Sequence, residues 1–415
     1  MSVDLSCEFM HIKLKNPFLI ASVPATSAGG FSKAAKAGWA GGVHWGGEAL
    51  TGGSWARGYI PREFNSLGKS QQCWAYENSV AVLEEIDHEQ HQPPERVEKL
   101  IRQAKESGIV VGCNIFEGKN PEAWGRVAAA AERGGADFLE LNWSCPYLPE
   151  TGLGIGLNRE KRIATLKSVR ENCELPVMVK LGAALERDML AEAAIGAVES
   201  GANAISITNT FTGLAGVDIE TGMPISCELG VDGKLRGMIG GISGPAIKPM
   251  GLRGVAEVRQ ATDVPISAIG GITDWQSAVE YMLLGASTVQ VGTAVMLFGY
   301  RVVREMTRGL EEYMERKGYK TINDFIGITT DKYLVGKEHV EPAQTQPRKM
   351  VVDEDKCTGC GLCLIACEAT SDSGALRIED RVAKIDHSLC HSCNSCRTIC
   401  PEGAITLEWD PRYLV

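Results

Sequence analysis

The sequence of 415 residues contains no apolar run that approaches the ~20 residues a membrane-spanning helix requires. Its first residues, Met1 to Glu8, include no Lys or Arg and precede no apolar core, so we expect no secretory signal. Basic residues are also fewer than acidic ones: the chain has 42 Lys and Arg and 52 Asp and Glu, which gives a net charge of −10. This balance argues against binding to nucleic acids or anionic membranes. We expect a cytoplasmic protein.

Two familiar cofactor motifs are missing as well. The nearest approach to the dinucleotide-binding pattern G-x-G-x-x-G is Gly152-Leu153-Gly154-Ile155-Gly156, and Leu157 stands where the third glycine belongs. We interpret this stretch as a flexible active-site loop. His88-Glu89-Gln90-His91 likewise lacks the H-E-x-x-H spacing of a zinc site. The chain therefore shows no NAD-binding motif.

Cysteine, by contrast, is abundant and clustered, because eight of the 14 cysteines lie between Cys357 and Cys400. In a cytoplasmic chain this clustering indicates metal ligation rather than disulfides. Two runs with the spacing C-x2-C-x2-C-x3-C are typical of bacterial ferredoxins that hold two [4Fe–4S] clusters. A zinc ribbon also uses C-x2-C pairs, but it has no use for the middle cysteine of a triple.

In such ferredoxins the fourth cysteine of each run binds the cluster of the other run. This rule gives one cluster the ligands Cys357, Cys360, Cys363 and Cys400, and the other the ligands Cys390, Cys393, Cys396 and Cys367. Two clusters in series carry single electrons, so we expect an organic redox group between them and the substrate.

From Pro17 onward, short apolar runs alternate with amphipathic stretches that often end in glycine. The predicted strands are 18–22, 42–45, 110–115, 138–143, 177–181, 204–208, 265–269 and 288–291. The predicted helices are 32–38, 94–108, 121–134, 158–172, 186–201, 252–261, 274–285 and 300–317. Eight strand–helix units predict a parallel (β/α)8 barrel.

The periodicity ends near Lys317, which suggests three parts. We expect residues 1–317 to form the barrel, 318–348 a linker, and 349–415 a small ferredoxin-like domain. Two connections, from Gly46 to about Gln92 and from Phe211 to about Pro249, are much longer than the usual ~4–6 residues. Loops of that length are commonly lids or binding elements.

The stretch Leu139 to Pro146 predicts the catalytic end of the barrel. An apolar strand ends there in Asn142, Ser144 and Cys145, and chemistry in such barrels sits at the carboxyl ends of the strands. We interpret Cys145 as the residue that moves a proton, with Ser144 beside it. The alternative is that Cys145 is a small buried hydrophobic residue, as free cysteines often are.

Glycine-rich stretches follow the last three strands and indicate a phosphate site. Backbone N–H groups in such loops cradle phosphate at this end of many barrels, although the glycines could also serve only tight turns. A flavin mononucleotide suits the site, because a flavin converts single electrons into a hydride. The residues expected at the phosphate are Gly241, Gly244, Gly270, Gly271, Gly292 and Thr293.

These features resemble the class 1 dihydroorotate dehydrogenase family. With the cysteine-rich domain, the chain is similar to the catalytic subunit of bacterial dihydropyrimidine dehydrogenase. Beyond the glycine loops and the cysteine runs, the motifs that carry the resemblance are 16–18, Ala21-Ser22, Asn142-x-Ser144-Cys145-Pro146, Lys180-Leu181 and Thr208-Asn209-Thr210.

The resemblance implies that FMN lies at the barrel mouth, with Ala21, Ser22 and Thr208 lining it and Lys180 near its N1 and O2 atoms. It also implies a substrate site and a proton donor, Cys145. An Asn side chain offers both a donor and an acceptor to an imide edge. The implied substrate-binding residues are Asn78, Asn142, Asn209, Thr210 and Tyr147.

The implied reaction is reduction of the C=C bond of uracil or thymine. FMN N5 would supply the hydride and Cys145 the proton. Electrons would enter through the two [4Fe–4S] clusters from an NAD(P)H-oxidising flavoprotein subunit or a ferredoxin, in a homo- or hetero-oligomer.

Three positions depart from the family pattern: Val43-His44-Trp45-Gly46 lacks an expected lysine, Tyr147 replaces a histidine, and Gly182-Ala183-Ala184 replaces Thr-Pro-Asn. All three surround the substrate and the pyrimidine edge of the flavin. They leave open a second reading, in which the substrate is another conjugated amide, acid or thioester. A third reading is a non-catalytic electron-transfer subunit.

Overall fold

The computed structural model describes residues 3–44, 56–57, 82–84, 93–117, 120–145, 152–183, 187–214, 217–224, 227–229, 232–237, 240–333 and 347–413. These residues fall into two compact units, one that ends at 333 and one that spans 347–413. Among the described residues, no helix has the length and apolar character needed to cross a membrane.

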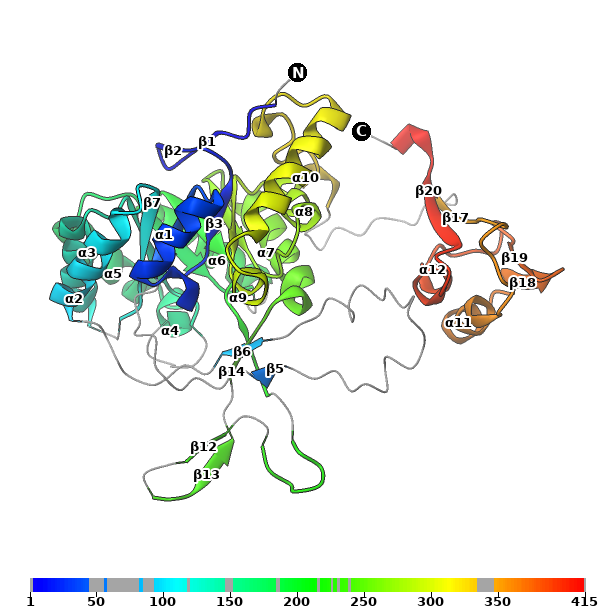
Figure 1. Ribbon diagram of the computed structural model, residues 1–415, viewed down its shortest axis with the longest axis horizontal. Coiled ribbons are helices and arrows are strands. Elements are labelled where there is room, and N and C mark those ends of the chain that lie inside the picture. The colour runs from blue at the N-terminus through cyan, green and yellow to red at the C-terminus, as the bar shows by residue number, and fades with distance from the viewer. Residues whose placement is uncertain are drawn as a thin grey trace. The chain divides into compact units, whose positions relative to one another are not determined.

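The first unit is a closed barrel of eight parallel strands surrounded by helices (Figure 1). In barrel order the strands are β3 (Phe18–Ile20), β4 (Gly41–His44), β7 (Val110–Ile115), β8 (Phe138–Asn142), β9 (Val177–Leu181), β10 (Ala204–Ile207), β15 (Ile266–Ile269) and β16 (Thr288–Val291). The predicted (β/α)8 fold is therefore confirmed, and every predicted strand is present within two residues at either end.

The helices that cover the barrel also follow the sequence pattern. Several begin at side chains that accept hydrogen bonds from the first turn: Asn120 from Glu122 N, Asn158 from Lys161 N, and Asp274 from Ser277 N. The covering helices are α1 (Ala28–Ala37), α2 (Pro94–Lys105), α3 (Pro121–Gly134), α5 (Arg159–Asn172), α6 (Arg187–Glu199), α7 (Lys248–Ala261), α8 (Trp275–Leu283) and α10 (Val302–Lys317).

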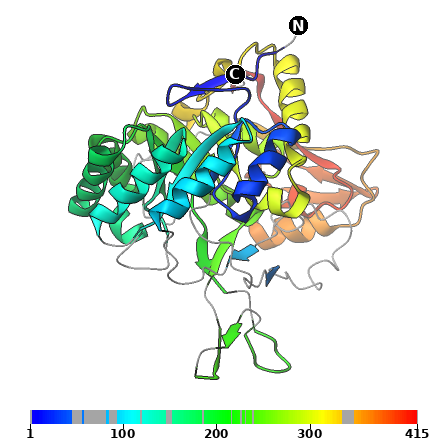
Figure 2. The same ribbon diagram turned by 60° about the vertical axis from the view of Figure 1, so that its left-hand side comes forward.

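The floor of the barrel is closed by a hairpin that the sequence analysis did not predict. Strands β1 (Cys7–Phe9) and β2 (Ile12–Leu14) pair antiparallel, and Phe9, Met10 and Leu14 pack into the barrel. There they meet an apolar layer from five barrel strands, which comprises Leu19, Val43, Phe138, Met178 and Ala204. In Figures 1 and 2 the hairpin lies at one end of the barrel and β14 at the other.

Above this apolar floor, the barrel interior becomes polar. Glu140 on β8 is fully buried and accepts hydrogen bonds from Asn114 Nδ2 (2.8 Å), Ser206 Oγ (2.7 Å) and Gln290 Nε2 (3.1 Å). Gln290 Nε2 also donates to Ser267 Oγ (3.2 Å). Because buried polar groups need partners, this network fixes the orientations of its members directly beneath the strand tips.

His44, the last residue of β4, is buried against helix α1. Its ring stacks on Phe31, with centroids 6.2 Å apart, and within the described part of the chain neither ring nitrogen has a hydrogen-bond partner. Burial lowers the pKa of His44 from 6.5 to about 4. The imidazole is therefore neutral in the folded protein at physiological pH.

We predict that His44 makes the barrel less stable in mild acid. Below pH 6.5 the unfolded chain protonates this residue, whereas the folded chain does so only near pH 4, so stability falls between these values. The loss should approach about 3 kcal/mol, because each unit of pKa difference corresponds to about 1.4 kcal/mol. Urea unfolding followed by tryptophan fluorescence at both ends of this range would measure it.

His44→Phe removes the titrating group and should flatten the pH dependence. His11→Gln is the matched control, because the His11 side chain is 97% exposed. If wild type and His44→Phe lose stability in parallel, His44 is not the source of the acid sensitivity.

The predicted linker 318–348 starts too early, and its last residue already belongs to the second unit. Residues 318–333 belong to the barrel unit, because Ile322 and Phe325 are fully buried in its core and Thr321 pairs with Asp4. At the other end, Arg348 already begins strand β17 of the second unit. Residues 334–346 lie outside the described residues. The linker was predicted because the helical periodicity of the sequence ends at residue 317. Loss of periodicity does not distinguish a linker from an irregular segment that packs into the core.

The two long connections meet in a small sheet with the strand order β11-β14-β6-β5. Strand β14 pairs antiparallel with both β11 and β6, and so joins a segment from each connection. A separate hairpin lies between β11 and β14 in the chain. The sheet strands are β5 (Ala56–Arg57), β6 (Val82–Glu84), β11 (Phe211–Gly213) and β14 (Gly240–Ser243), and the hairpin strands are β12 (Cys227–Leu229) and β13 (Leu235–Gly237).

The second unit has two halves of similar construction. Its elements are β17 (Arg348–Val352), α11 (Leu362–Thr370), β18 (Leu376–Glu379), β19 (Val382–Ile385), α12 (Ser395–Ile399) and β20 (Ile405–Trp409). Strand β17 pairs with β20, and β18 pairs with β19. Its small apolar core includes Met350, Leu376, Ala383 and Ile405. With so few apolar residues, the unit depends on what its cysteines bind.

Candidate active site and cluster-binding sites

An open cavity of about 560 Å³ lies at the carboxyl ends of the barrel strands. Its lining comes from the tips of β3, β9, β10, β15 and β16 and from the segment after β14. Nine of the ten residues predicted to bind the flavin line this cavity: Ala21, Ser22, Lys180, Thr208, Gly244, Gly270, Gly271, Gly292 and Thr293. The strand tips thus converge as the barrel topology requires.

Gly241 is the exception. It lies within β14, where it pairs with Thr212 of β11 and with Glu84 of β6, and it does not line the cavity. The glycine pattern alone did not distinguish a loop glycine from one inside a strand. Of that stretch, only Ser243 and Gly244 reach the cavity.

Lys180 provides positive charge in the cavity wall. It lies on β9 and is buried, and its side-chain ammonium makes no hydrogen bond or ion pair with any described residue. A buried cation without a partner carries a desolvation cost that an anionic ligand would relieve. The electron-rich N1 and O2 edge of a flavin fits this requirement.

The glycines at the cavity form tight turns that require glycine. Gly244, Gly270 and Gly271 have φ values of 86°, 125° and 66°, which side chains other than glycine rarely adopt. A Cβ at Gly271 would also lie 2.7 Å from Lys248 Cβ. Such loops expose N–H groups, and this arrangement fits the phosphate of a mononucleotide.

Three predicted substrate and catalytic residues form one hydrogen-bond network beside the cavity. Asn209 Nδ2 donates to Ser144 Oγ (2.9 Å) and to Asn142 Oδ1 (3.3 Å), and Ser144 Oγ donates to Asn142 Oδ1 (2.9 Å). The backbone N–H of Thr210 donates to Asn209 Oδ1 (2.8 Å). Asn209 and Thr210 line the cavity itself, so the network connects it to the tip of β8.

Cys145 is 4% exposed and directly follows Ser144 at the tip of β8. The glycine-rich stretch interpreted as a flexible active-site loop is instead a short helix, α4 (Gly152–Gly156), packed on this tip. The interpretation was wrong because glycines that allow close backbone packing look the same in sequence as glycines that confer flexibility. Asn78 and Tyr147, both predicted at the substrate, lie outside the described residues.

The sequence analysis missed three polar residues near the cavity. Gln290 and Ser243 line it, and Glu140 anchors Gln290 from below. Glu140 could have been found by strand alternation, because it lies two residues before Asn142 and therefore faces the same side of β8. Gln290 could also have been found, because it is a large polar residue within an apolar strand.

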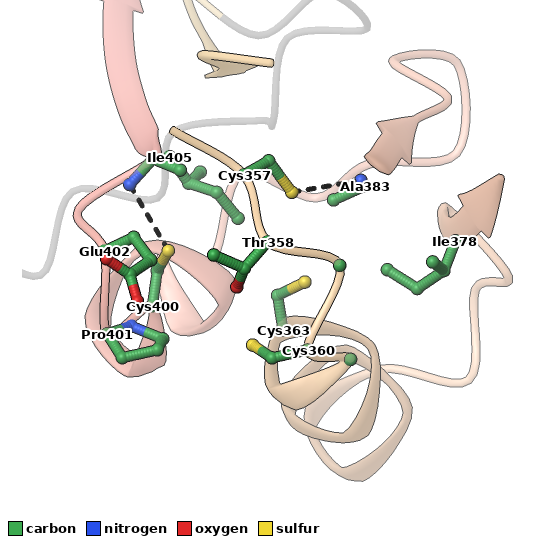
Figure 3. A pocket seen from close by; sticks show the side chains of 13 residues that line it. Cys357, Thr358, Cys360, Cys363, Ile378, Ala383, Cys400, Pro401, Glu402 and Ile405 are labelled. Atoms are coloured by element: carbon green, nitrogen blue, oxygen red, sulfur yellow. Dashed lines mark hydrogen bonds between the residues drawn. The ribbon is translucent and has the colours of Figure 1, made fainter. Parts of the chain in front are cut away.

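In the second unit, the first predicted set of ligands lines one cavity. Cys357, Cys360 and Cys363 from the first run and Cys400 from the second surround an open space of about 340 Å³ (Figure 3). The backbone N–H of Ala383 donates to Cys357 Sγ (3.4 Å), and that of Ala404 donates to Cys400 Sγ (3.3 Å). Hydrogen bonds to cluster-bound sulfur are a known means of setting a redox potential.

The second predicted set lines another cavity, of about 380 Å³. It comprises Cys390, Cys393, Cys396 and, from the first run, Cys367. The two runs use matching backbone turns, because Gly361 (φ 79°) and Asn394 (φ 74°) both stand directly before a helix in the left-handed region. This repetition brings the three thiols of each run to one cavity.

The C-x2-C-x2-C-x3-C spacing of each run in the sequence favours clusters over single metal ions. Within the described residues, no three Cys, His, Asp or Glu side chains converge in a way that would hold one metal ion. Each set of four thiols instead surrounds an open cavity. A tetrahedral zinc site draws its sulfurs to about 2.3 Å from one centre, whereas a cubane holds them further apart.

Comparison with known proteins agrees with this architecture. Residues 4–314 match the family model of dihydroorotate dehydrogenase. The chain belongs to the dihydroorotate dehydrogenase family. Residues 350–407 match the model of the 4Fe-4S dicluster domain, so this family member carries an iron–sulfur domain after its barrel.

Two kinds of relative support the assignment to the dihydroorotate dehydrogenase family. The chain is 31% identical to the NAD-dependent dihydropyrimidine dehydrogenase subunit PreA of Escherichia coli (strain K12), over 98% of this chain and 96% of that protein. It is 38% identical to the catalytic subunit of dihydroorotate dehydrogenase B (NAD(+)) of Thermococcus kodakarensis, over 47% of this chain and 61% of that one. The corresponding subunit of Pyrococcus furiosus is 39% identical, over 52% and 67%.

Membership of the dihydroorotate dehydrogenase family confirms the predicted class of enzyme. The chain is an oxidoreductase that acts on CH–CH bonds and uses a flavin together with iron–sulfur. The resemblance stated from the sequence is confirmed as well, because the dihydropyrimidine dehydrogenase relative covers nearly the whole chain.

Proposed function

We propose that this enzyme reduces the C=C bond of a pyrimidine, converting uracil or thymine to its 5,6-dihydro form. The observation that carries the proposal is the network of Asn142, Ser144 and Asn209, which connects the barrel cavity to the strand tip that carries Cys145. Asn side chains offer a donor and an acceptor, which match the alternating N–H and C=O groups of a pyrimidine. The similarity to a dihydropyrimidine dehydrogenase subunit over 98% of the chain supports the same substrate class.

FMN, when bound, supplies a hydride to C6 of the pyrimidine. The Lys180 ammonium, which has no partner among the described residues, would stabilise negative charge at the N1 edge of the flavin. Because they line the same cavity, Ala21, Ser22 and Thr208 would border the ring, and Gly244, Gly270, Gly271, Gly292 and Thr293 would border the phosphate.

Cys145 completes the reaction as a general acid. Its S–H bond breaks as a C–H bond forms at C5, so the alkene gains one hydride and one proton, and solvent later returns a proton to the thiolate. A cysteine thiol is mostly protonated at neutral pH, as this role requires. Asn142, Asn209 and Thr210 hold the ring, with Asn78 and Tyr147 proposed to complete the substrate site.

Electrons reach the barrel one at a time through two [4Fe–4S] clusters. We assign Cys357, Cys360, Cys363 and Cys400 to one cluster and Cys390, Cys393, Cys396 and Cys367 to the other. The donor is a second subunit that oxidises NAD(P)H, or a ferredoxin, because the chain has no dinucleotide-binding motif. The Escherichia coli relative is itself named as an NAD-dependent subunit.

The function can be tested by reoxidation of the reduced protein. The purified holoenzyme is reduced anaerobically until its flavin absorbance bleaches, and candidate oxidants are then added one at a time. We expect uracil and thymine to restore the flavin absorbance and to be converted to their dihydro forms. Orotate, enoyl acids and enoyl thioesters serve as the comparison set.

The outcomes separate the three readings. Reoxidation by uracil or thymine supports pyrimidine reduction. Reoxidation only by orotate or by enoyl compounds contradicts it and assigns the same machinery to another conjugated substrate. Failure of every compound, with flavin and iron contents intact, assigns the chain to electron transfer without catalysis.

A further inference from the structure

We propose that helix α4 and the buried Arg162 form a positioning element for Cys145. In this view Gly152, Gly156 and Arg162 are positioning residues, which never touch the substrate but fix the backbone that carries the thiol. The inference rests on the proposed role of Cys145 as proton donor.

Helix α4 packs backbone against backbone on the tip of β8. A Cβ built on Gly152 would lie 2.6 Å from Cys145 O, 2.7 Å from Cys145 Cβ and 2.8 Å from Cys145 N. Gly152 also has a φ of 38°, which disfavours any side chain. At the other end of α4, a Cβ on Gly156 would lie 2.5 Å from Trp143 O. Both ends of the helix therefore require glycine to reach the segment 143–145.

Arg162 anchors α4 from the opposite side. Its side chain is only 3% exposed, and Nη1 donates to the carbonyl oxygen of Gly156 at 2.6 Å. Nη2 lies 3.5 Å from Glu192 Oε1, but that carboxylate is 72% exposed. A Cβ on Gly196 would lie 2.7 Å from Nη2, so α6 also needs a glycine to admit the guanidinium.

These contacts form a continuous chain from α6 through Arg162 and α4 to Cys145. A buried guanidinium is costly unless its hydrogen bonds are made, so the bond to Gly156 holds Arg162 and α4 in one arrangement. A general acid must lie within about 3 Å of the atom that it protonates. Fixing the backbone on both sides of Ser144 is what brings the thiol to that distance.

The test compares Gly152→Ala with Gly108→Ala in the holoenzyme. Gly108 is the matched control because it also has a positive φ (76°), whereas its Cβ would meet nothing within 4 Å. We expect Gly152→Ala to lower kcat on the order of 10²-fold, the cost of a misplacement of about 1 Å, with KM little changed. Gly108→Ala should leave both parameters unchanged.

A readout independent of turnover is the reactivity of the thiol. The holoenzyme without substrate is treated anaerobically with iodoacetamide, and modification of the Cys145 peptide is followed by mass spectrometry. We expect Gly152→Ala to alkylate Cys145 several-fold faster than wild type, because the packing that buries the thiol is lost, while flavin and iron contents stay unchanged.

Arg162→Lys provides a second route if Gly152→Ala does not fold. A single ammonium lacks the planar fork of the guanidinium, so kcat should fall and alkylation should rise, both less than in Gly152→Ala. Glu192→Gln should change little, because Glu192 is exposed.

Wild-type kcat and alkylation in the folded Gly152→Ala variant, or in Arg162→Lys if the former does not fold, would overturn the inference. A Cys145→Ala variant with full turnover would instead overturn the proposed function, so the two failures are distinguishable. Parallel loss of flavin and activity would also count against a positioning role, because it indicates general damage to the barrel.

Discussion

Cys145→Ala is expected to lower turnover by between about 10² and 10⁴-fold, the usual contribution of a general acid. The variant should keep its flavin and its iron, because Cys145 does not line the flavin cavity and lies outside both four-cysteine sets. Without the thiol, the proton for C5 of the pyrimidine must come from water, which is neither positioned nor sufficiently acidic. The defect should therefore fall on the substrate half-reaction alone.

Anaerobic stopped-flow measurements separate that half-reaction from flavin reduction. Reduction of the flavin by the electron donor should proceed at the wild-type rate in Cys145→Ala, whereas reoxidation by uracil or thymine should slow. Cys7→Ala is the matched control, since Cys7 lies in the hairpin at the opposite end of the barrel. Normal reoxidation in Cys145→Ala would assign the proton to another group.

Cys400→Ala is expected to abolish turnover supported by the electron donor and to remove about half of the iron, one of two clusters. Cys400 lines the cavity of the first run although it belongs to the second run in sequence. Loss of one cluster interrupts the path to the flavin. Chemically reduced flavin should still be reoxidised by substrate, because the residues that line the cavity belong to the barrel unit.

Double substitutions test which cysteines share a cluster. Cys357→Ala combined with Cys400→Ala should lose no more iron than either single variant, because both serve one cluster. Cys357→Ala combined with Cys367→Ala should lose nearly all of it, because the two residues serve different clusters although they belong to one run. Iron analysis with low-temperature electron paramagnetic resonance would measure both outcomes. The reverse pattern, in which Cys357 and Cys367 behave as one set, would show that each run binds its own cluster.

The barrel was predictable because its signals are local. The bounds of all eight strand–helix units were predicted to within a few residues. The signals were apolar strands, helix-capping Asn and Asp, and glycines after helices. The floor hairpin at Phe9, Met10 and Leu14 was missed because two strands of three residues carry almost no periodic pattern. The segment around Ile322 and Phe325 was also missed, because only its tertiary contacts show that it belongs to the core.

The candidate site was predictable where residue type and strand position coincide. Lys180, Asn142 and Cys145 stand at strand tips, so the topology alone brings them to one end of the barrel. Gly241 and Gly152 show the limit of that reasoning. A glycine serves equally in a strand, in a phosphate loop or in a close backbone contact, and only the surrounding atoms distinguish these uses.

The exchanged fourth cysteines have a consequence for how the protein matures. The first run supplies three thiols, but its cavity is closed only by Cys400, which leaves the ribosome 37 positions after Cys363. A nascent chain that has exposed Cys357, Cys360 and Cys363 thus offers iron an incomplete site. Under the proposed assignment, neither cluster can be inserted until nearly all of the ferredoxin-like segment has been synthesised, so we expect metal loading and folding of this domain to form a single late event.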